Sequence, residues 1–94
     1  MARRRRGPIS KAIKRLCSDL FHNRIDERQF KAELRAIIQT HGATGYVLQG
    51  IGMALDKWSQ GFGDAFKEKV WGLADEVDPR IRDLFEKWKQ RMSG

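Results

Sequence analysis

The chain has 94 residues, a net charge of +7 and one cysteine, and 40% of its residues are hydrophobic. This length allows one small domain, and the composition is that of a folded protein rather than a disordered one. A single cysteine excludes an internal disulfide. The longest uncharged stretch, residues 36–55 with His41 taken as neutral, contains glutamine and four glycines, which argues against a membrane-spanning helix. We therefore expect a soluble protein.

The positive charge is concentrated at the N-terminus. Residues 1–24 hold eight basic side chains and one acidic side chain, whereas residues 25–94 hold 11 of each kind. Such an asymmetry indicates an anionic partner that binds one part of the molecule.

The chain begins with an arginine run, and we expect residues 1–7 to form a flexible arm because they have nothing to bury. Residues 8–94 are expected to form a single helical domain. The first helix is predicted from Pro8 to His22, with proline in the first turn, where its missing N–H is not needed. Its apolar face contains Ile9, Ile13, Leu16, Cys17, Leu20 and Phe21.

The second helix has the clearest boundary signals in the chain. Asp26 is expected to cap its N-terminus, with Gln29 three residues later to complete a capping box. Gly42 is expected to end it. The apolar face between these points is formed by Phe30, Leu34, Ile37 and Ile38.

Residues 45–77 carry an apolar stripe at helical spacing. Steps of three and four residues place eight side chains on one side of a helix. The segment is either one long helix or two helices broken near Gly61 and Gly63. The eight residues are Ile51, Leu55, Trp58, Phe62, Phe66, Val70, Leu73 and Val77.

Glycines recur every eleven residues in the same segment, which keeps each set on one line of a helix. We interpret both lines as marks of close helix packing. The two sets are Gly50, Gly61 and Gly72, and Gly52 and Gly63.

A second apolar set faces away from the main stripe and would be hard to cover in a small monomer. It predicts a protein interface, and a second copy of the chain is among the candidate partners. Its members are Tyr46, Met53 and Trp71.

Asp78 and Pro79 are expected to start a last helix with a basic outer face. No stretch alternates as a strand does. The predicted fold is all-α, a small bundle of four or five helices around a long glycine-laced central helix, with the flexible basic arm at its N-terminus.

The basic N-terminus is the strongest functional signal. Guanidinium groups bind phosphates in pairs of hydrogen bonds, and the first helix continues the positive charge. We expect salt-dependent binding to nucleic-acid phosphates with little sequence preference, and DNA and RNA remain open. The alternatives are an anionic membrane surface, a solubilising tail and a localisation signal. The predicted contacts are Arg3, Arg4, Arg5, Arg6, Lys11, Lys14 and Arg15.

No set of residues indicates catalysis. Cys17, His22 and His41 match no zinc spacing, and Cys17 is expected to be a small buried hydrophobe. The acidic residues 75, 76 and 78 are expected at a solvated helix junction. The G-x-G pairs lack a preceding strand and the third glycine of a dinucleotide site. We expect no metal, cofactor or small-molecule substrate, and no enzymatic activity.

The run from Leu20 to Gly52 resembles a helical segment of tailed-phage minor head proteins of the head-morphogenesis type. The resemblance implies a phage or prophage origin and a structural role, and it transfers no catalytic residue. It covers about half of the chain and continues faintly through Phe66 and Leu73 to Val77. The positions that carry it are Ile25, Phe30, Leu34, Ile38, His41, Gly50 and Gly52.

Three functional hypotheses follow. The first is a structural or packaging-associated phage protein that binds nucleic acid through its N-terminus and a phage or host protein through its helical body. The second is a small phage-encoded inhibitor of a host nucleic-acid enzyme. The third is a cationic helical protein that acts on membranes. The first two place the protein in the host cytoplasm or in the virion.

Overall fold

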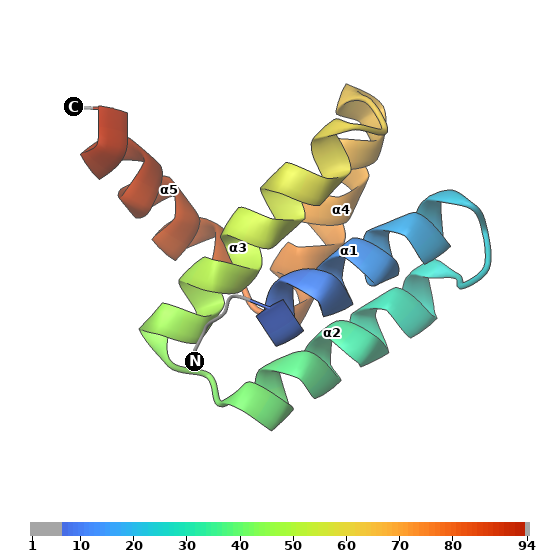
Figure 1. Ribbon diagram of the computed structural model, residues 1–94, viewed down its shortest axis with the longest axis horizontal. Helices are drawn as coiled ribbons and strands as arrows, with labels where there is room; N and C mark the ends of the chain where they lie inside the picture. The colour runs from blue at the N-terminus through green and yellow to red at the C-terminus, as the bar shows by residue number, and fades with distance from the viewer. Residues whose placement is uncertain (1–6, 94) are drawn as a thin grey trace.

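The computed structural model describes residues 7–93, which form five α-helices and contain no strand. Figure 1 shows them packed as a small bundle, so the all-α fold class is confirmed. Residues 1–6 of the predicted arm lie outside the described residues, and Gly7 already belongs to the first helix. The helices are α1 (Gly7–Phe21), α2 (Glu27–His41), α3 (Gly45–Gln60), α4 (Asp64–Val77) and α5 (Arg80–Ser93).

The helix at the centre of the bundle is α3, which contacts each of the other four helices. It can do so because α3 carries a single acidic and a single basic residue, Asp56 and Lys57, both near its C-terminal end. Leu48, Ile51 and Leu55 are almost completely buried. Burial of each such side chain contributes about 1.5–3 kcal/mol relative to exposure.

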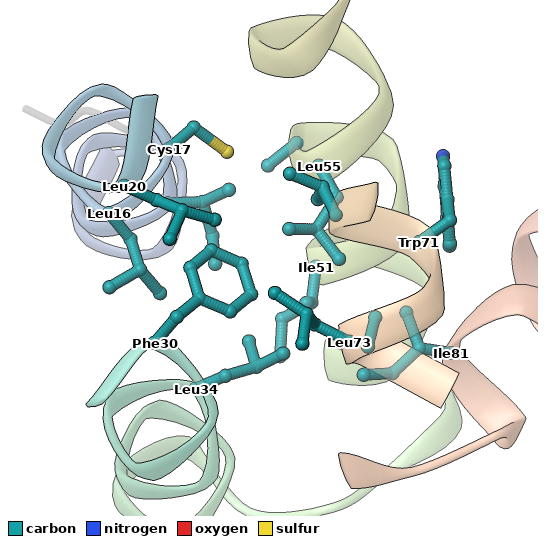
Figure 2. Close-up of a cluster of buried hydrophobic side chains, with 14 of the residues drawn as sticks. Leu16, Cys17, Leu20, Phe30, Leu34, Ile51, Leu55, Trp71, Leu73 and Ile81 are labelled. Carbon is teal, nitrogen blue, oxygen red and sulfur yellow. The ribbon is translucent and has the colours of Figure 1, made fainter. Parts of the chain in front are cut away.

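The core forms where α1, α2, α3 and α4 meet. Figure 2 shows the ring of Phe30 from α2 lying among side chains of α1 and α3, with Leu73 of α4 beside them. All the side chains of this group are buried, as the hydrophobic face of each helix predicts. The group includes Leu16, Leu20, Phe30, Leu34, Ile51, Leu55 and Leu73.

The segment 45–77 is two helices, so the predicted long central helix is wrong and the two-helix alternative is correct. The chain turns at residues 61–63, where Phe62 N–H donates to the carbonyl of Ser59 at 3.1 Å. Gly63 has φ +98°, a left-handed conformation that side chains disfavour and that cannot continue an α-helix. The turn sends α4 back along α3 and against α2.

The eleven-residue glycine spacing does not mark a packing interface. Only Gly52 lies at a close helix crossing, where an added Cβ would be 2.9 Å from Phe85 Cβ. Around Gly50 and Gly72 no atom would lie within 4 Å of an added Cβ. Gly61 and Gly63 belong to the turn between α3 and α4. The two glycine lines therefore contain one residue at a close helix crossing, two in a turn and two with open space around them, rather than one packing surface.

The predicted boundaries of α2 are confirmed. The carboxylate of Asp26 accepts a hydrogen bond of 2.8 Å from Gln29 N–H, and Gly42, at φ 87°, donates its N–H to Ile38 O at 2.7 Å. The second half of the capping box is not made: no hydrogen bond joins the Asp26 N–H to the Gln29 side chain, whose amide N–H donates to Glu33 at 2.9 Å.

Asp26→Ala should lower the free energy of unfolding by about 1 kcal/mol, because one N–H of the first turn loses its partner. For a domain of this size we expect Tm to fall by roughly 4–8 °C in calorimetry. Asp26→Asn, which keeps an acceptor, is the control and should lose much less. Equal losses in the two variants would contradict the capping role.

The junction of α4 and α5 is held by Asp78. Its carboxylate accepts from Arg80 N–H at 3.0 Å and from the Arg80 guanidinium at 2.6 Å. The guanidinium hydrogen bond is the main reason that the pKa of Asp78 is lowered.

Beyond this junction α5 packs through Ile81 and Phe85. Figure 1 shows its C-terminal half extending away from the bundle, and Met92 in this half is exposed.

Candidate nucleic-acid interface

The outer face of α1 is basic. Ile13, Leu16, Cys17 and Leu20 are buried on the opposite face, which leaves Lys11, Lys14 and Arg15 exposed. Residues three and four apart are neighbours on a helix surface. Lys11 is therefore next to both of the other cations, and the three form one cluster.

None of these three cations forms an ion pair with an acidic side chain within residues 7–93. Some basic residues elsewhere are paired between helices, as in Lys31–Glu76 at 2.7 Å. A pair of like charges four residues apart, such as Lys11 and Arg15, costs a helix about 0.2–0.5 kcal/mol. An anionic ligand at this face would offset that cost.

The positive surface continues from α1 to α3 across Trp58. The indole Nε1–H donates to Ser10 Oγ at 3.2 Å, and the Nζ of Lys14 lies 4.9 Å from the ring centroid. The Nζ of Lys57 lies at the same distance from this ring. Trp58 belongs to the apolar stripe predicted for residues 45–77, and it is half-buried at the edge of the core.

Lys57 is a member of this surface that the sequence did not predict. It lies 43 positions after Lys14 in a different helix, and only the packing of α3 on α1 brings the two ammonium groups to one ring. On the other side of α1 the surface is less positive, because Arg15 borders a shallow groove that is also lined by Asp19 and Glu33.

The predicted contacts Arg3, Arg4, Arg5 and Arg6 lie outside the described residues. In the sequence they immediately precede Gly7, the first residue of α1. Lys11, the first lysine of the cluster, follows four residues later. The arginine run and the basic face of α1 are thus consecutive parts of the chain.

Of the predicted interface residues, Tyr46 and Met53 are on the surface of α3, with 88% and 37% of their area exposed. Trp71 is only 7% exposed, so its predicted place on that surface is wrong. Its ring lies 5.2 Å from that of Phe85, and the Arg82 guanidinium lies over it at 5.3 Å. The cause is α5, which supplies both of these side chains and covers the ring.

Cys17 and His22, two of the three residues weighed as metal ligands, lie in different surroundings. Cys17 is fully buried, and burial raises the pKa of its thiol to about 12, so the group stays protonated at neutral pH. His22 is exposed at the end of α1, where its ring packs edge-on against Phe21 with centroids 5.2 Å apart. Within residues 7–93, no three His, Cys, Asp or Glu side chains are placed to hold a metal ion.

The acidic residues at the end of α4 are engaged in ion pairs. Asp75 pairs with Arg82 at 3.1 Å, and Glu76 pairs with Lys31 of α2 at 2.7 Å. Together with the Asp78–Arg80 pair they join neighbouring segments of the fold. These contacts give the carboxylates a structural role at the junction.

Comparison with protein-family models, with curated proteins and with solved structures finds no match for this chain. Among residues 7–93, none of the helices has the length and hydropathy needed to cross a bilayer. Function must therefore be argued from the surface described above.

Proposed function

We propose that the protein binds nucleic acid without sequence preference, through the phosphate backbone. The basic face of α1 carries this proposal: Lys11, Lys14 and Arg15 are exposed together and have no acidic partner within the described part of the chain. The arginine run Arg3–Arg6 precedes this face directly in the sequence. Lysine and arginine side chains that contact phosphates supply affinity and position without reading bases.

The proposal includes a structural or packaging-associated role in a phage. Its support is the resemblance of residues 20–52 to phage minor head proteins. Three positions of that pattern, Phe30, Leu34 and Ile38, are buried core positions of α2. Tyr46 and Met53, which are exposed on α3, are the proposed contacts to a phage or host protein or to a second copy of the chain.

The test is a series of binding measurements across salt concentration, by fluorescence anisotropy with a short labelled duplex and a single strand. Affinity should fall steeply with salt, with a slope of about −0.9 for each duplex phosphate contacted and about −0.7 on the single strand. Replacing Arg3–Arg6 by alanine should reduce the magnitude of the slope by roughly three to four, one for each lost phosphate contact.

A charge-matched pair of variants separates this face from net charge alone. The triple variant Lys11→Ala, Lys14→Ala, Arg15→Ala removes the basic face of α1. The triple variant Lys87→Ala, Lys89→Ala, Arg91→Ala removes the same charge from exposed positions of α5. We expect the α1 variant to bind much more weakly than the α5 variant. Equal losses, or an affinity independent of salt, would overturn the proposal.

A further inference from the structure

Two ammonium groups from different helices meet at the ring of Trp58. The Nζ atoms of Lys14 and Lys57 each lie 4.9 Å from its centroid, so they are separated by no more than twice that distance. Trp58 is half-buried and its Nε1–H is bonded to Ser10 Oγ at 3.2 Å, which fixes the ring against α1. Attraction between each cation and the ring holds both lysines beside it.

Neither lysine is neutralised by a carboxylate in the described part of the chain. Asp56, which precedes Lys57, is bound by Lys67 Nζ at 3.0 Å and by the Gln60 amide at 3.0 Å. The side chains of Lys14 and Lys57 therefore bring like charges together with only the ring to offset their repulsion. An anion between or beside the two ammonium groups would remove that repulsion.

We propose that Lys14 and Lys57 form a two-lysine site that binds one phosphodiester group of a nucleic-acid strand. This inference rests on the proposed function and adds the path of the strand. The backbone runs from the basic face of α1 across Trp58 to the C-terminal part of α3. It does not run toward α2, because there Arg15 shares its groove with Asp19 and Glu33.

A phosphodiester fits this site because each lysine is a compact point charge with three N–H donors that needs no planar partner. The adjoining Lys11 supplies a contact for the preceding phosphate of the same strand. A free phosphate ion would use only the two lysines, so it should bind far more weakly than a strand that contacts the whole surface.

The experiment uses the full chain with Lys14→Gln, Lys57→Gln and the double variant, and measures binding to a labelled oligonucleotide across salt concentration. Each single variant should weaken binding about 2- to 5-fold at low salt, the range of an exposed ion pair. The double variant should reduce the magnitude of the salt slope by roughly one, and each single variant by less, because the two lysines share one phosphate. Because both lysines contact one phosphate, the double variant should lose less than the product of the two single losses.

Lys89→Gln is the control. Lys89 is also exposed and also lies over an aromatic ring, with its Nζ 6.0 Å from the centroid of Phe85, but it belongs to α5. The control should bind as the unaltered protein does. If Lys57→Gln matches Lys89→Gln while the unaltered protein still binds in a salt-dependent manner, the two-lysine site is wrong and the proposed function stands.

If the unaltered protein shows no salt-dependent binding, the two-lysine site and the proposed function both fail. Titration with inorganic phosphate, against chloride at equal ionic strength, identifies the source of the anion. Tryptophan fluorescence should respond to the oligonucleotide and not to phosphate. A saturable response to phosphate alone that is lost in Lys57→Gln would overturn the assignment to a nucleic-acid strand.

Discussion

Gly52→Ala should lower the free energy of unfolding by about 1–3 kcal/mol, the usual cost of overpacking a tight contact. The new Cβ would lie 2.9 Å from Phe85 Cβ and 3.2 Å from the carbonyl oxygen of Ile81. Both atoms are fixed to the backbone of α5, so rotation of a side chain cannot relieve the contact. The whole of α5 must shift away from α3, and its buried residues Ile81 and Phe85 lose packing.

Gly50→Ala is the matched control, two residues away on the same helix. No atom lies within 4 Å of the Cβ it would add, so the gain of about 1 kcal/mol in helix propensity should appear as increased stability. Urea denaturation of the two variants should therefore give shifts of opposite sign. Shifts of the same sign would mean that α5 does not approach α3 as closely as described.

Phe30→Ala should produce the largest loss of stability, about 3–5 kcal/mol, because it removes a ring from the middle of the core. Phe30 has no exposed surface, and its ring lies where α1, α2 and α3 meet. Such a loss is a large part of the 5–15 kcal/mol available to a typical domain. We expect urea denaturation to show a much lower midpoint, with part of the population unfolded in buffer at 37 °C.

Phe21→Ala is the comparison for this prediction. Phe21 is 44% exposed and stacks on Phe62 with ring centroids 4.2 Å apart. Loss of an aromatic pair at the surface should cost about 0.5–1.5 kcal/mol beyond the small area that it buries. A Phe21 variant as unstable as the Phe30 variant would show that the end of α1 is as important to folding as the centre of the core.

The sequence predicts the features that depend on local chemistry. Asp26 and Gly42 define the ends of α2 because a cap and a left-handed glycine act within one helical turn. The burial of Ile13, Leu16, Cys17 and Leu20 on α1 follows from spacing along one helix, whereas Phe21, predicted on the same face, is 44% exposed. The predicted caps of α2 and the burial of these four residues are confirmed, and they position the basic face of α1 on the outside.

Features that depend on the packing of different helices could not be predicted in the same way. The apolar stripe keeps its phase across residues 61–63, so periodicity alone could not distinguish one helix from two. Trp71 is covered by α5, which a helical projection of residues 45–77 leaves out. Lys57 joins the candidate interface only because α3 lies on α1.

The position of α3 also determines how parts of the molecule open to solvent. A helix that contacts all four others cannot lose its hydrogen bonds unless most of the core separates. The C-terminal turns of α5 extend beyond the bundle and can fray while the core stays intact. Backbone amide exchange in α3 therefore reports global unfolding, whereas exchange at the end of α5 reports local opening.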